Sequence, residues 1–254
     1  MSETLILCGF AFLAGLVDAV VGGGGLLQVP ALMAILPAAP IALILGTNKL
    51  SSIAGTAAAA LRFGWSVPID WRAVIPATVL AGIGASFGAR LAVSVDGGFL
   101  KPVVVGVLLI MLAHTLMRRQ LGSQKSAPKF NTANIVGLSA LGSIMGFYDG
   151  FLGPGTGSML IFGLVKLFRY DFLSAAATTK VLNLATNFGA LVVFAATDNV
   201  AYGVGLPMAA MNILGSSLGA HLAIKGGNQL IRAVFLAVVG ILIVKILLDL
   251  VSGP

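Results

Sequence analysis

The sequence predicts an all-α polytopic membrane protein made of two inverted-topology repeats of about five helical segments each, with helices broken at glycine-rich motifs. Three observations predict this fold: the composition, a series of apolar runs, and a match of the chain with itself at an offset of 131 residues. Hydrophobic residues make up 58% of the 254 residues and charged residues 9%, whereas a soluble globular domain carries roughly 25% charged residues. A soluble fold could not cover its surface with so few charges, which excludes soluble enzymes, nucleic-acid-binding proteins and disordered proteins.

Ten apolar runs follow one another along the chain, and most are close to the ~20 residues that a membrane-spanning helix needs. The first run follows Met1-Ser2-Glu3, which has no basic segment, so we expect a retained transmembrane helix and not a signal peptide. The second run contains Pro30, Pro37 and Pro40, which predict two short or kinked pieces. The runs lie at residues 4–21, 26–46, 49–64, 73–93, 99–117, 134–152, 157–170, 173–197, 203–223 and 229–250.

One basic stretch separates the runs into two sets of five. Residues 118–133 carry Arg118, Arg119, Lys125 and Lys129, and we expect them to form a cytoplasmic linker between a first transmembrane repeat, residues 1–117, and a second, residues 134–254. The formal net charge of +7 is typical of basic cytoplasmic loops in a membrane protein. The lipid bilayer, and no nucleic acid, is therefore the expected partner of this basic excess.

The two halves match without a gap at an offset of 131 residues. The match pairs residue types that are rare in this composition, so it indicates an internal duplication. The informative pairs are Asp18/Asp149, Lys49/Lys180 and Pro76/Pro207, together with Gly15/Gly146, Gly22/Gly153, Gly24/Gly155, Gly84/Gly215 and Gly88/Gly219.

Five crossings in each half would leave the second half inverted relative to the first. With the linker in the cytoplasm, both chain termini lie outside it. Loop charges favour this orientation, because positive residues are enriched in cytoplasmic loops. The inside set is Arg62, Arg72, Arg118, Arg119, Lys125, Lys129, Lys166, Arg169, Lys225 and Arg232, and the outside set is Arg90, Lys101 and Lys245. If the short second and third runs of each half re-enter the membrane, the repeats would be parallel instead.

Glycine clusters interrupt each half at matching positions. Four consecutive glycines, Gly22, Gly23, Gly24 and Gly25, follow the first run, and Gly153, Gly155 and Gly157 follow the sixth. A helix broken at membrane depth is tolerated where it lines a cavity or is buried in protein. Its free N–H groups and the next helix N-terminus form a cradle for an anion. A flexible joint or close helix packing is the alternative interpretation, and no Gly-Lys-Ser/Thr sequence supports a nucleotide loop.

Each half also carries a lysine among apolar residues. Lys49 follows Thr47 and Asn48, and Lys180 follows Thr178 and Thr179. A lysine at a membrane helix centre costs at least ~2.5 kcal/mol and is by default a candidate for function. The alternative is that its side chain extends to the membrane interface.

Asp18 and Asp149 are the acidic residues inside confident spanning runs. They are candidates for proton coupling, or they neutralise the two lysines as buried ion pairs. The GxxxG patterns Gly84–Gly88 and Gly215–Gly219 predict close helix packing within the protein.

At these motifs the chain resembles the sulfite exporter TauE/SafE family of bacterial and archaeal membrane permeases, over about Leu5 to Leu250. The family implies transport of small anions, often sulfur compounds such as sulfite, sulfonates or sulfoacetate, across the cytoplasmic membrane. Pro154 and Thr156 stand where the first half has Gly23 and Gly25, so the half-sites are not chemically identical. The resemblance rests on Gly15-Leu-Val-Asp18-Ala-Val-Val-Gly22-Gly-Gly-Gly25 followed by Pro30, on Gly46-Thr-Asn-Lys49, on Gly153-Pro-Gly-Thr-Gly157 and on Thr186-Asn187.

We therefore expect a multi-pass secondary transporter of the inner (cytoplasmic) membrane, not an enzyme, that moves a small anion by alternating access without a cofactor or metal. A sulfur oxyanion or organosulfonate is the expected substrate. An anion channel, or a permease for another small anion such as a carboxylate, is the alternative. The expected substrate-binding residues are Gly22, Gly23, Gly24, Gly25, Thr47, Asn48, Lys49, Gly153, Gly155, Thr156, Gly157, Thr178, Thr179, Lys180, Asn183 and Asn187.

Overall fold

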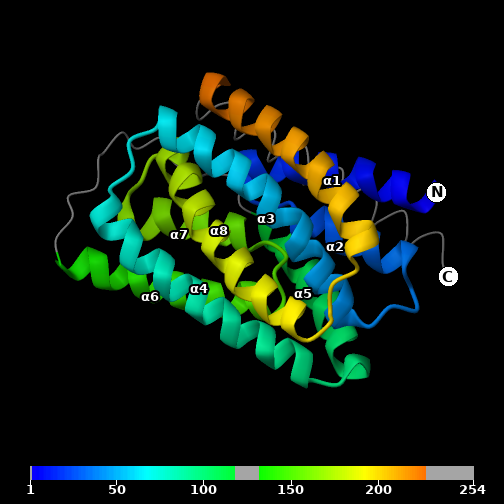
Figure 1. Ribbon diagram of the computed structural model, residues 1–254. Helices are drawn as coiled ribbons and strands as arrows, with labels where there is room; N and C mark the ends of the chain where they lie inside the picture. Colours follow the sequence, from blue (N-terminus) through cyan, green and yellow to red (C-terminus); the bar gives the residue numbers. More distant parts are fainter. Residues whose placement is uncertain (1, 118–131, 227–254) are drawn as a thin grey trace.

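The computed structural model describes residues 2–117 and 132–226, and this part of the chain is helical, without a strand (Figure 1). Most of the predicted linker and the last apolar run, with Arg232 and Lys245, lie outside the described residues. The helices are α1 (Ser2–Val21), α2 (Gly25–Ile35), α3 (Ile41–Ser66), α4 (Trp71–Ser94), α5 (Gly97–Met117), α6 (Thr132–Phe151), α7 (Thr156–Phe168) and α8 (Phe172–Ala196), and residues 202–226 are helical as well.

Both glycine clusters separate two helices. The chain leaves α1 at Val21 and enters α2 at Gly25, and Gly22 between them has a φ of 74°. After α6, Gly153 and Gly155 have φ values of 89° and 84°, and α7 begins at Thr156. Glycine adopts positive φ without the steric cost that a side chain adds, which explains why the chain turns at these residues.

The structure corrects the boundary between the second and third apolar runs. The run expected at residues 26–46 stops at Ile35, and the turn at 36–40 contains two of the three prolines. α3 then continues without interruption from Ile41 through Lys49 to Ser66. The prediction that prolines split this run into two pieces is confirmed, whereas the run boundary between residues 46 and 49 is not a helix end, because one glycine costs a helix only about 1 kcal/mol. Thr47 fits the helix as well, since its hydroxyl donates to the Leu43 carbonyl at 2.6 Å.

Glycine-mediated helix contacts repeat in the two halves. In α4, Gly84 lies against Ser143 of α6 and Gly88 against Phe147. At the 131-residue offset, Gly215 lies against Phe12 of α1 and Gly219 against Leu16. A β-carbon at any of these glycines would clash with the facing backbone, so the expectation that both GxxxG patterns serve close packing within the protein is confirmed.

α3 and α8 lie side by side and run in opposite directions (Figure 1). Thr47, near the start of α3, accepts a hydrogen bond from Ala201, just past the end of α8. Further along, the Asn187 amide of α8 donates to Thr56 of α3 at 3.4 Å. Thr56 and Asn187 are themselves 131 residues apart, so the two halves meet at equivalent positions of equivalent helices.

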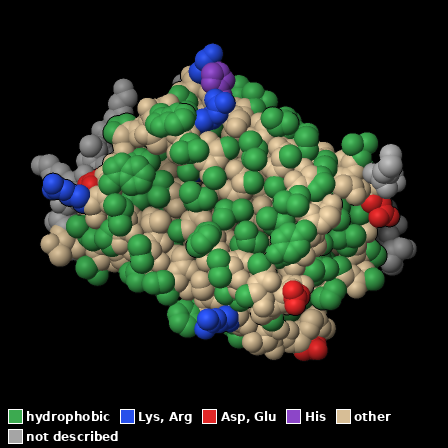
Figure 2. All heavy atoms as spheres, viewed as in Figure 1, with side chains coloured by type: hydrophobic (Ala, Val, Ile, Leu, Met, Phe, Trp, Pro, Cys, Tyr) green, Lys and Arg blue, Asp and Glu red, His purple; other side chains and the backbone are tan. Residues whose placement is uncertain are grey.

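The outer surface is apolar over broad areas, with charged side chains near the edges of the face in Figure 2. α4 illustrates the pattern, since it exposes a stripe at four-residue spacing and buries alanines on its other side. Three of the described helical stretches, Glu3–Val21, Trp71–Ser94 and Phe172–Ala196, are long and apolar enough to cross a membrane. The α4 stripe is Ile75, Val79, Ile83 and Phe87, and the buried alanines are Ala77, Ala81 and Ala85.

Candidate functional site

A small polar cavity lies where the two helix breaks meet α3 and α8. Its volume is about 30 Å³, which is room for about two water molecules. Five pairs of its lining residues are equivalent at the 131-residue offset, so both halves build it. These pairs are Asp18/Asp149, Gly22/Gly153, Gly25/Thr156, Ser52/Asn183 and Thr56/Asn187, and Asn48, Lys49, Gly155 and Gly157 complete the lining.

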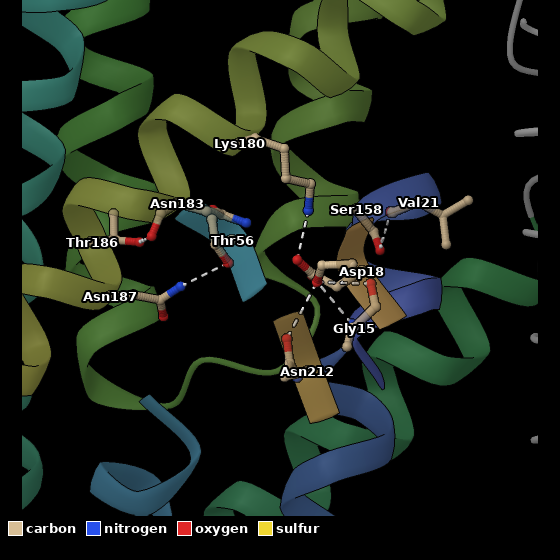
Figure 3. Close-up of polar contacts among 12 residues, drawn as sticks. Gly15, Asp18, Val21, Thr56, Ser158, Lys180, Asn183, Thr186, Asn187 and Asn212 are labelled. Atoms are coloured by element: carbon tan, nitrogen blue, oxygen red, sulfur yellow. Dashed lines mark hydrogen bonds and ion pairs between the residues drawn. The ribbon is translucent and has the colours of Figure 1, made fainter. Parts of the chain in front are cut away.

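The two breaks touch each other directly. The Ser158 N–H, in the first turn of α7, donates to the Gly22 carbonyl at 3.0 Å, and the Ser158 hydroxyl donates to the Val21 carbonyl at 3.2 Å (Figure 3). A β-carbon on Gly22 would lie 2.6 Å from the α-carbon of Gly157. Glycine is therefore required here for backbone approach as well as for conformation.

Two ion pairs flank the cavity, and each joins one half of the chain to the other; both lysines and Asp149 are buried, and the Asp18 side chain is 20% exposed. The Lys180 ammonium donates to the Asp18 carboxylate at 2.6 Å (Figure 3). The Lys49 ammonium lies 2.7 Å from the Asp149 carboxylate. The side chains of Lys49 and Lys180 are 3% and 0% exposed, so neither ammonium extends to the surface. A buried charge needs a partner of this kind, because removing one member of a buried pair costs about 3–5 kcal/mol.

The two pairs differ in how they are held. Asp18 bonds Lys180 through one oxygen and accepts the Gly24 N–H through the other at 3.3 Å, which ties the pair to the first break. Asp149 has a close contact to Lys49, but its nearer oxygen has no aligned hydrogen bond among the described residues.

The second break is held by other residues. The Tyr148 hydroxyl donates to the Pro154 carbonyl at 2.7 Å, and the Thr156 hydroxyl donates to the Gly153 carbonyl at 2.7 Å. Val17 stands at the position equivalent to Tyr148, so the first break has no such brace. The two half-sites therefore differ in chemistry, as the sequence comparison of the glycine motifs indicated.

Amide and hydroxyl groups form the remaining wall. The side-chain oxygens of Asn48 and Asn183 are buried without a hydrogen-bond partner in the described part of the chain, and both residues line the cavity. Ser52 and Thr56 also line it, and the sequence analysis missed them. The offset could have identified them, because they are equivalent to Asn183 and Asn187, which were expected at the site.

Other expected binding residues do not line the cavity. The Thr47 hydroxyl accepts the Ala201 N–H at 3.0 Å and so fixes the end of the loop after α8. Thr178 and Thr179 are buried in α8. Gly23 and Gly24 belong to the first break but not to the wall, and Lys180 reaches the site only through Asp18.

A second polar network, which the sequence analysis did not identify, lies beside α1. The Asn212 amide donates to Gln28 at 3.0 Å and to the Ala11 carbonyl at 3.1 Å. Ser216 donates to the Gly15 carbonyl at 3.2 Å. The positions equivalent to Asn212 and Ser216 are alanines in α4, so this contact of α1 is polar where its counterpart is apolar.

Comparison with known proteins identifies the family. The model of the sulfite exporter TauE/SafE family matches residues 7–246. The chain belongs to this family. The resemblance of the glycine and lysine motifs is thereby confirmed.

Three relatives are described as probable membrane transporter proteins. One from Sinorhizobium is 32% identical, over 94% of this chain and 90% of the relative. One from Haemophilus influenzae is 33% identical, over 87% and 85%, and one from Escherichia coli K12 is 30% identical, over 94% and 87%. No solved structure matches the chain. This TauE/SafE protein is therefore an integral membrane protein and a membrane transporter, in a family of transporters and not of enzymes.

Proposed function

We propose that this TauE/SafE protein is a multi-pass permease of the cytoplasmic membrane that moves a small sulfur oxyanion or organosulfonate by alternating access. The observation that carries the proposal is the cavity where Lys49 meets both glycine breaks. A buried ammonium there can be compensated by a carboxylate or by a bound anion. An anion that enters the cavity would meet the one ammonium in its wall.

Several donor groups of the wall suit an oxyanion. The N-terminus of α7, a helix of 13 residues, begins in the wall at Thr156 and Gly157, and helix N-termini favour negative charge. Asn183, Asn187 and Ser52 add side-chain donors from two helices. Donors that converge from several directions fit the three oxygens of a sulfonate better than the two coplanar oxygens of a carboxylate.

The arrangement of the halves supports alternating access. α3 and α8 are equivalent helices that run antiparallel and meet at the equivalent residues Thr56 and Asn187. A two-fold axis that relates antiparallel helices is perpendicular to them, and so lies in the membrane plane if these helices cross the membrane. Such an axis is characteristic of inverted repeats, whose halves exchange conformations around one fixed site.

A ligand screen followed by a transport assay tests the proposal. A ligand that binds the folded state raises its thermal stability by mass action. Sulfite, sulfate and ethanesulfonate are compared with acetate and chloride in detergent, and we expect a concentration-dependent rise for the sulfur anions. Lys49→Gln should abolish the rise.

Counterflow of the labelled hit in proteoliposomes then separates a carrier, which exchanges labelled for unlabelled substrate, from a channel, which does not. Stabilisation by acetate alone would reject the sulfur-anion class, and a conductance without counterflow would reject alternating access.

A further inference from the structure

We infer that each monovalent anion that binds is accompanied by one proton, and that Asp149, not its equivalent Asp18, takes up this proton. The inference rests on the proposed function, because it concerns what the cavity does when an anion enters. It assigns different roles to two carboxylates that the duplication made equivalent.

The charges around the cavity balance before an anion enters. Asp18, Lys49 and Asp149 line it, and Lys180 is bonded to Asp18. In the described part of the chain, these two ammonium groups and two carboxylates sum to zero. A monovalent anion would leave one negative charge without compensation in a buried site, and an uncompensated buried charge is strongly unfavourable. One proton from water that converts a carboxylate into a carboxylic acid restores neutrality, without any oxidation or reduction.

Contacts select Asp149 as the acceptor of that proton. An anion in the cavity competes for Lys49, which is part of the wall, and the carboxylate that loses this ammonium is Asp149. Lys180 is not in the wall, and an entering anion does not reach it directly.

Asp18 is bonded to the first break as well as to its lysine, whereas the contact that the structure records for the Asp149 carboxylate is with Lys49. Both carboxylate oxygens of Asp18 accept hydrogen bonds. One accepts from the Lys180 ammonium and the other from the Gly24 N–H of the first break. The second break is braced by the Tyr148 hydroxyl and the Thr156 hydroxyl, so the Asp149 side chain can change its charge while the break keeps its shape.

No second cation in the described residues faces Asp149 from the helices around it. From α3 it meets Lys49, and on α6 its neighbour Tyr148 is bonded to Pro154. The lysine of α8 is committed to Asp18. The lysine of α7 is in the last turn of that helix, and the arginines of α4 are exposed. Once Lys49 turns to the anion, protonation is the remaining way to neutralise Asp149.

The experiment measures the affinity for ethanesulfonate as a function of pH. The charge of this probe is constant between about pH 5 and 9, so a pH effect reports on the protein. If binding takes up one proton, affinity rises as pH falls, by about tenfold per pH unit between the pKa of the ion-paired carboxylate and the pKa it has once the anion holds its lysine. In Asp149→Asn we expect no such slope. In Asp198→Asn, which removes an exposed carboxylate beyond α8, we expect the wild-type slope.

A second measurement does not depend on a variant. Titration calorimetry of the wild-type protein in buffers with different ionisation enthalpies counts the protons taken up, and we expect about one per anion. A count of zero, a flat wild-type profile, or a slope that persists in Asp149→Asn would overturn the inference. Loss of the slope in a folded Asp18→Asn would overturn it as well. Absence of any anion binding at every pH would instead reject the proposed function.

Discussion

The ion pair between Lys180 and Asp18 gives the sharpest prediction about stability. Asp18→Asn leaves the Lys180 ammonium, which is 0% exposed, without a charged partner. Breaking a buried pair in this way costs about 3–5 kcal/mol. Since about 1 kcal/mol shifts the Tm of a chain of this size by about 2–4 °C, we expect the Tm to fall by about 6–20 °C. The introduced asparagine keeps a side-chain oxygen that can accept a hydrogen bond from the Gly24 N–H. The expected loss of stability therefore comes from the missing carboxylate charge.

A double variant separates the pair from its surroundings. Replacing both charged groups, as in Asp18→Asn with Lys180→Met, removes the uncompensated ammonium and leaves a side chain of similar length. Such replacements of whole buried pairs are often neutral, so we expect most of the lost Tm to return. The assay is thermal unfolding in detergent, monitored by fluorescence, with size exclusion to check monodispersity. A single variant within about 2 °C of the wild type, or a double variant less stable than both single variants, would refute the reasoning.

Three further predictions follow from other features. Lys49→Gln removes a charge-assisted bond worth roughly 1.5–3 kcal/mol, so anion affinity should drop about 10- to 150-fold; it also leaves Asp149 without its ammonium, so the Tm should fall as well, and unchanged affinity in the folded variant would return Lys49 to a structural role. Gly22→Ala places a β-carbon against the Gly157 backbone at a φ of 74° and should lower the Tm by several degrees, whereas Gly9→Ala, with open space around its β-carbon, should not; equal Tm values would contradict the required contact. Alkaline phosphatase fused to the C-terminus should be active and a fusion at residue 125 inactive, because both termini are expected outside the cytoplasm; the opposite pattern would contradict the inverted repeats.

Rare residues made the site predictable in outline. Lysine and aspartate are uncommon in this composition, so their agreement at the 131-residue offset identified the four charged groups that the structure places around the cavity. The pairing was not predictable. Whether Lys49 meets Asp18 or Asp149 depends on how one half packs on the other, and local spacing contains no information about that packing.

The errors also have physical causes. The boundary near Thr47 was misplaced because hydropathy falls at Thr47, Asn48 and Lys49 while helix formation does not, and all three side chains are buried within α3. Asn212 and Ser216 were missed because their equivalents are alanines. A comparison of the two halves identifies the residues that both halves share, and it misses polar residues that are present in one half alone.

Each ion pair joins a residue of the first half to a residue of the second half, and this has a consequence for how the protein is made. When the first half has been synthesised, the groups that neutralise Lys49 and Asp18 in the folded protein still lie 100 and 162 residues further along the chain. Both ion pairs can therefore form only after the second half has been synthesised and has packed against the first.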